Sequence, residues 1–118
     1  MGNAVRGETD FQVGDRSYSL LLDVNAFCAL EAELDLTTDI ILAQYATGAS
    51  LTMVRALAWA ALQDSHPCTL EEAGRIVNQA GVAATKEAIE RAMANALPEP
   101  DTANPPKRDR TKKAAGAG

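Results

Sequence analysis

The chain has 118 residues, of which 47% are hydrophobic but only 4% aromatic, and its formal net charge is −5. This length leaves room for one domain, whose core must be filled mostly by Ala, Leu, Val and Ile. The acidic balance argues against binding of a nucleic-acid backbone by the folded part, because that affinity comes from Lys and Arg.

Charge and composition change near residue 98. Residues 1–97 carry 13 acidic and 6 basic side chains, whereas residues 98–118 carry 3 acidic and 5 basic ones. The last segment is rich in Pro and has no large apolar residue to bury, so it is predicted to be a disordered basic tail. We therefore expect a flexible N-terminus over residues 1–9, one folded domain over residues 10–97 and the tail over residues 98–118.

The first predicted element is a β-hairpin. Residues 9–13 and 16–22 alternate apolar and polar side chains, and Gly14 and Asp15 between them supply turn chemistry. A lone hairpin is barely stable in water, so its apolar face is expected to pack on helices. That face carries Phe11, Val13, Tyr18 and Leu20.

A first helix is expected directly after the hairpin, with Asp23 or Asn25 as its N-cap. Its apolar residues have helical spacing and form one stripe, namely Phe27, Leu30 and Leu34. Its acidic residues are spaced by two, so they fan around the helix and do not converge as a catalytic pair would. They predict a solvated acidic face made of Glu31, Glu33 and Asp35.

A second helix is predicted to begin at Thr37 or Thr38 and to stop near Gly48. The third runs from Leu51 to about Asp64, and it is apolar over so much of its surface that it should be the central, most buried helix. Its predicted buried residues are Leu51, Val54, Leu57, Ala58, Ala61 and Leu62.

The fourth helix is predicted to open at Thr69, which forms a capping box with Glu72, and to end at Gly81. The fifth runs from about Ala83 to Leu97. Together with the hairpin, these elements define a mainly α fold with five short helices in one small domain.

No motif for catalysis or cofactor binding is recognisable. The single histidine, His66, precedes Pro67 and is expected to be an ordinary loop residue. His66, Cys68 and Cys28 together would supply only three of the four ligands that a structural zinc ion needs. Two cysteines are also few for a small secreted scaffold, which predicts free thiols in a reducing cytosol. We expect no enzyme activity, no metal and no cofactor.

Trp59 suggests a candidate partner-binding stripe. On the third helix it lines up with Thr52, Arg55 and Gln63, which form the most polar stripe available. Tryptophan is enriched at binding hot spots, so Arg55, Trp59 and Gln63 are candidate contacts. The alternative is that Trp59 packs under the hairpin or the last helix, because so small a core needs its one large side chain.

The basic tail offers a second candidate contact. Lys107, Arg108 and Arg110 could touch nucleic acid or an acidic protein surface. The alternative is a solubilising disordered end. The sequence shows no signal peptide and no apolar run of the roughly 18 residues that a membrane-spanning helix needs.

The hairpin and first helix resemble the small tail proteins of gene transfer agents and related phages, and the similarity extends over about residues 10–97. This family is grouped with phage tail assembly chaperones and is also labelled a tail tube protein family. The residues that carry the resemblance are Phe11, Gly14, Arg16, Tyr18, Leu20, Ala26, Ala29, Leu30 and Glu31.

The resemblance implies a non-enzymatic role in the cytoplasm of a bacterial host cell. Such a chaperone binds the tape-measure protein, a long helical chain prone to aggregation, and helps tail tube subunits polymerise around it. Self-association is a further possibility. Two alternatives stay open: a structural tail component retained in the particle, such as a tube or terminator protein, and a small regulatory domain that binds nucleic acid through the basic tail.

Overall fold

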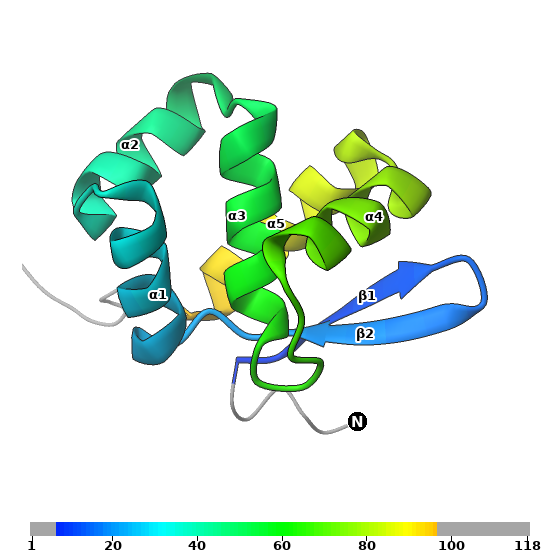
Figure 1. The fold of residues 1–118 in the computed structure, drawn as a ribbon. Helices are drawn as coiled ribbons and strands as arrows, with labels where there is room; N and C mark the ends of the chain where they lie inside the picture. Colours follow the sequence, from blue (N-terminus) through cyan, green and yellow to red (C-terminus); the bar gives the residue numbers. More distant parts are fainter. Residues whose placement is uncertain (1–6, 97–118) are drawn as a thin grey trace, which may run out of the picture.

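Two strands are followed by five helices in the computed structural model, which describes residues 7–96 (Figure 1). This arrangement confirms the predicted mainly α fold with an N-terminal hairpin. The tail over residues 98–118 lies outside the described residues. The elements are β1 (Thr9–Val13), β2 (Arg16–Leu20), α1 (Val24–Leu34), α2 (Thr38–Gly48), α3 (Leu51–Leu62), α4 (Leu70–Ala80) and α5 (Val82–Ala96).

The hairpin forms as its alternation predicts. β1 and β2 are antiparallel, with Phe11 opposite Tyr18, and Gly14 takes a φ of 60° in the turn. Gly adopts such a positive φ without steric cost. The predicted inner face is buried against the helices, with Phe11 only 2% exposed and Leu20 fully covered.

Strand β2 ends at Leu20, two residues earlier than the sequence predicts. The chain leaves the ladder there because it turns onto α3, where the backbone N–H of Leu21 donates to the carbonyl of Ala61 at 2.9 Å. Leu21 and Leu22 are nevertheless buried. The extra apolar residues of this segment therefore serve the junction between hairpin and helices.

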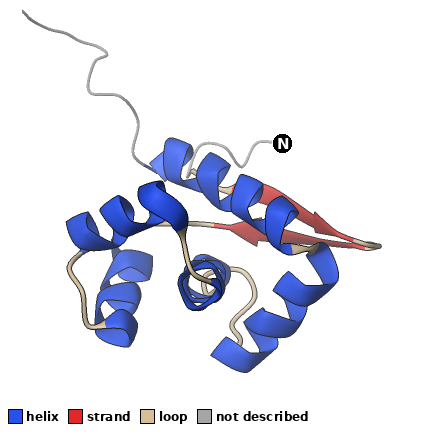
Figure 2. Cartoon of the chain, turned by 90° about the horizontal axis from the view of Figure 1, so that it is seen from above, coloured by secondary structure: helices blue, strands red, loops and turns tan. Residues whose placement is uncertain are grey.

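Helix α3 is the centre of the fold. Figure 2 looks down its axis and shows the other helices and the hairpin arranged around it. Its contacts extend to α1, α4, α5 and β2, and Leu57, Ala58, Ala61 and Leu62 are all fully covered. The predicted central, most buried helix is thus confirmed.

The prediction that Leu51 is buried is wrong. Leu51 is the first residue of α3 and is 68% exposed. The helices that cover α3 leave its first residue largely exposed. The apolar pattern of α3 alone therefore assigns Leu51 to the buried face, although it faces solvent. α3 also ends at Leu62, two residues before the predicted end.

Helix starts are fixed by side-chain caps, two of which the sequence predicts. The carboxylate of Asp23 accepts from the backbone N–H of Ala26 at 2.9 Å and caps α1. Thr69 and Glu72 form the expected capping box at the start of α4. Each such cap satisfies an N–H that the helix itself leaves unpaired.

The cap of α2 comes from a residue that was expected only to face solvent. Thr37 makes no side-chain cap bond to the helix backbone. Instead, Oε2 of Glu31 accepts from the backbone N–H and from the hydroxyl of Thr38, each at 2.8 Å. Glu31 is half-buried as a result, whereas Glu33 and Asp35 are exposed as predicted. A carboxylate at this place also interacts favourably with the helix dipole.

Helix α5 ties the two ends of the described chain together. The side-chain amide of Asn95 donates to the hydroxyl of Thr9 at 2.8 Å, and Arg91 donates to the carbonyl of Asp10 at 3.4 Å. Thr9 is buried and already belongs to β1. The folded part therefore begins before the predicted boundary at residue 10.

Substitution can distinguish the capping carboxylate of Glu31 from the exposed carboxylate of Glu33 by their effects on stability. Glu31→Ala removes two hydrogen bonds at the start of α2 and should lower the free energy of unfolding by about 1–2 kcal/mol. Glu33→Ala, on the same helix but exposed, should change it by less than about 0.5 kcal/mol. Urea denaturation measures both values. Equal losses in the two variants would contradict the capping role of Glu31.

Tyr45 should make stability depend on pH in alkali. Its hydroxyl donates to the carbonyl of Lys86 at 3.2 Å, linking α2 to α5. Burial, with a smaller effect from the charge of Glu90, raises the pKa of Tyr45 from 10.0 to about 12. The folded state thus favours the neutral phenol, and this stabilisation is complete below pH 10 and is lost as pH rises towards about 12.

The measurement is the midpoint of urea denaturation at several pH values between 9 and about 12. The wild-type midpoint should fall over this window because the unfolded tyrosine ionises first. In Tyr45→Phe the midpoint should fall less over this pH range, because the ionisation of Tyr45 no longer contributes. A variant that follows the same pH curve as the wild type would show that Tyr45 does not cause it.

Candidate functional site

Trp59 and Gln63 lie where α3 meets the loop that leads to α4. The indole N–H of Trp59 donates to the carbonyl of Cys68 at 3.1 Å. The side-chain amide of Gln63 donates to the carbonyl of Trp59 at 2.8 Å and to that of Cys68 at 3.1 Å. These bonds fasten the loop to α3, and Trp59 also packs against the hydrophobic core. Both side chains are half-buried.

The other predicted partner contacts are placed differently. Arg55 is exposed on α3 and, within residues 7–96, donates no hydrogen bond. The tail residues Lys107, Arg108 and Arg110 lie outside the described residues. A partner-binding role for these side chains, and for Trp59 and Gln63, stays a prediction.

Arg55 lines an apolar groove of about 270 Å³ formed by three helices, which we call the α3–α4–α5 groove. Two of its lining residues are large exposed hydrophobics, Leu51 at 68% and Val82 at 39%. Among the described residues, both side chains are therefore only partly covered. The full lining is Leu51, Thr52, Arg55, Gly74, Val77, Asn78 and Val82.

Gly74 shapes this groove. A Cβ atom at Gly74 would lie 3.1 Å from Cδ of Arg55, which is closer than ordinary van der Waals contact. The missing side chain therefore lets the stem of Arg55 rest against α4. The close neighbour of Gly74 is thus the Arg55 side chain.

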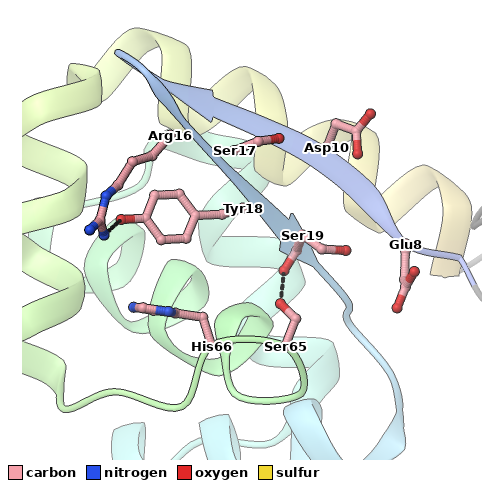
Figure 3. Close-up of a pocket in the computed structure, with 8 residues that line it drawn as sticks. All are labelled: Glu8, Asp10, Arg16, Ser17, Tyr18, Ser19, Ser65 and His66. Atoms are coloured by element: carbon pink, nitrogen blue, oxygen red, sulfur yellow. Dashed lines mark hydrogen bonds between the residues drawn. The ribbon is translucent and has the colours of Figure 1, made fainter.

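A second concave surface lies beside the hairpin, with a cavity of about 550 Å³ (Figure 3). The rings of Tyr18 and His66 meet edge to face, with their centres 5.0 Å apart. Arg16 donates to the hydroxyl of Tyr18 at 3.3 Å, and this bond raises the pKa of Arg16. The hydroxyl of Ser65 donates to the carbonyl of Ser19 at 2.8 Å and fixes the loop to β2.

A cavity of about 520 Å³ adjoins it on the side of α4 and shares Arg16, Tyr18 and His66 with it. We call this second part the Arg16–Arg75 cleft. Its lining comes from β2, from the loop after α3 and from α4, so the sequence did not predict it as a unit. Its remaining lining residues are Pro67, Glu72, Arg75, Ile76, Asn78 and Gln79.

Within residues 7–96, no three His, Cys, Asp or Glu side chains gather in a way that could hold a metal ion. Burial raises the pKa of the Cys68 thiol, which disfavours the nucleophilic thiolate. None of the helices in these residues is long and apolar enough to cross a membrane.

Comparisons with protein-family models, with curated proteins and with solved structures found no match for this chain. Function is therefore inferred from its own residues and from the two surfaces. Of these, the α3–α4–α5 groove contains one of the predicted partner contacts, Arg55.

Replacing Gly74 tests how Arg55 rests in the groove. Gly74→Ala should raise the free energy of unfolding by up to about 1 kcal/mol, because Ala favours the helix interior over Gly. The gain should be smaller than in an Arg55→Ala background, where the new methyl group meets no neighbour. Urea denaturation of the four proteins in this cycle gives the coupling between the two positions. An identical gain in both backgrounds would contradict the close contact.

Proposed function

We propose that this protein is a non-enzymatic tail assembly chaperone of a phage or gene transfer agent, and that it holds a helical segment of the tape-measure protein in the α3–α4–α5 groove. The observation that carries this proposal is the exposure of Leu51 and Val82 around an apolar groove that Arg55 borders. The resemblance of the hairpin and first helix to tail proteins supplies the identity of the partner.

The groove suits an amphipathic helix. A partner helix presents apolar side chains at i, i+3 or i+4, and i+7 along one face, and an apolar groove takes such a face without any reactive group. Leu51 and Val82 come from different helices and line one groove, unlike apolar residues scattered singly over a surface. Covering them removes apolar area from water, which favours association.

Arg55 limits which helix fits. The domain is acidic overall, so an exposed cation beside an apolar groove is a local exception. We expect an acidic side chain of the partner to face Arg55, because a complementary charge fixes the register of a docked helix. A tape-measure segment with an apolar face and such an acidic residue would be protected from aggregation while it is bound.

Co-expression tests the proposal. The tape-measure protein encoded in the same gene cluster should remain soluble when it is produced with the wild-type chain. Leu51→Glu and Arg55→Glu should each abolish most of this effect, because one places a charge in the groove and the other reverses a complementary charge. Val24→Glu is the matched control, since Val24 is 76% exposed but lies on α1, across α3 from the groove (Figure 1).

Two outcomes would contradict the proposal. The first is a tape-measure protein that is no more soluble with the chain than without it. The second is mass spectrometry of purified particles that finds the chain in a fixed ratio to the tube subunit, which would favour the structural tail component. Thermal denaturation of each variant confirms that a lost effect does not come from unfolding.

A further inference from the structure

The Arg16–Arg75 cleft concentrates positive charge in an acidic domain. Residues 7–96 contain 13 acidic but only 5 basic side chains. Two of the five, Arg16 and Arg75, line this one cleft together with the single histidine, His66. Arg16 comes from β2, His66 from a loop and Arg75 from α4, so the fold brings together groups that are distant in the sequence.

The cleft holds one carboxylate, that of Glu72, against the two guanidinium groups of Arg16 and Arg75. Oε1 of Glu72 accepts from the backbone N–H of Thr69 in the capping box of α4. Two more carboxylates, Glu8 and Asp10, line only the adjoining cavity on the far side of Tyr18. The cleft itself therefore presents more positive than available negative charge.

Several side chains that line the cleft carry hydrogen-bond donors. Figure 3 shows the side chains of Arg16, Tyr18 and His66 extending in the same direction from β2 and from the loop. Arg16 uses one N–H on the hydroxyl of Tyr18, which leaves other guanidinium N–H groups and the phenolic proton for a ligand. Within residues 7–96, Arg75 makes no hydrogen bond with its side chain and is exposed.

We propose that the Arg16–Arg75 cleft is a second binding site, separate from the α3–α4–α5 groove, and that it takes an acidic side chain carried by a segment of a protein partner. A guanidinium binds a carboxylate through two parallel hydrogen bonds, and a second guanidinium nearby strengthens the same charge-assisted contact. The apolar parts of Tyr18, Pro67 and Ile76 line the cleft as well, and they suit the uncharged residues of a peptide.

The charge of the whole domain favours a protein segment over a nucleic acid. Phosphates follow one another along every nucleic-acid strand, so a strand bound here would also run past the acidic surface around the cleft. A peptide can present one or two carboxylates while the residues before and after them are uncharged. The cleft meets this requirement because its cations are few and local.

The two surfaces share α4 and one of its residues, Asn78, but the other α4 residues that line them differ. Gly74 and Val77 line the groove, whereas Arg75, Ile76 and Gln79 line the cleft. Removing an arginine from one surface therefore leaves the cations of the other in place. Binding at each site can therefore be removed by substitution while the cations of the other site remain.

The test is an NMR titration of the full chain with two synthetic peptides of equal length and apolar content. One peptide carries two Glu residues and the other carries two Gln residues at the same positions. The Glu peptide should shift the side-chain N–H signals of Arg16 and Arg75 and the ring signals of His66, and the Gln peptide should not. Arg16→Ala and Arg75→Ala should each weaken binding of the Glu peptide at least about tenfold.

Lys86→Ala is the control, because it removes a cation of α5 that lines neither the cleft nor the groove, and it should leave binding of the Glu peptide unchanged. Arg75→Lys should bind with intermediate strength, since Lys keeps the charge but lacks the planar pair of donors. Backbone amide signals away from the cleft should be unchanged in every variant, which verifies the fold.

Three results would overturn the proposal. Equal binding of the Glu and Gln peptides would show that no carboxylate is recognised. Unchanged affinity in both Arg16→Ala and Arg75→Ala would place the site elsewhere. A single-stranded DNA oligonucleotide that shifts the same signals at lower concentration than the Glu peptide would make the cleft a phosphate site.

Discussion

Helix α3 has to bury apolar side chains on nearly every side, and the remaining elements are arranged to meet that demand. Ala58 and Ala61 are fully covered and small, so neighbouring elements can lie close to the axis of α3. The same small residues fill little volume, which leaves most of the packing to a few larger ones such as Leu57 and Leu62. Protein interiors are close-packed, so a domain with this little volume to spare depends on each of them.

Helix α4 stands between the two surfaces with binding potential. One of its sides faces the apolar groove, where an uncovered leucine and valine lie beside a single arginine. Its other side faces a polar cleft that is lined by hydrogen-bond donors. A hydrophobic site and a charge-recognising site on one short helix give a partner two kinds of contact, one that supplies affinity through apolar area and one that supplies selectivity through charge.

Local rules predicted most of the fold. The alternation around Gly14 predicts the hairpin and its apolar face, and the spacing of Thr69 and Glu72 predicts the start of α4, because both depend on neighbours in the sequence. The cap that Glu31 provides for α2 acts across seven residues and requires a particular angle between two helices. The spacing of apolar residues within one helix carries no information on the angle between two helices. The sequence therefore predicts that Glu31 faces solvent.

The candidate sites were less predictable than the fold. Arg55 was identified because its helix shows a polar stripe, and it lines the groove. The exposure of Leu51 depends on where neighbouring helices stop, which the pattern of α3 alone does not reveal. The sequence analysis does not predict the cleft, because Arg16, His66 and Arg75 come to line one surface only after the chain has folded.

The hydrogen bond between Asn95 and Thr9 has a consequence for how the chain folds. The two residues are 86 positions apart, and β1 also packs on α5. A strand made early in synthesis therefore completes its packing only when the last helix is present. Contacts of such long separation slow folding and favour one concerted transition over stepwise assembly. A partial chain still on the ribosome would lack the contacts between β1 and α5 until α5 has emerged.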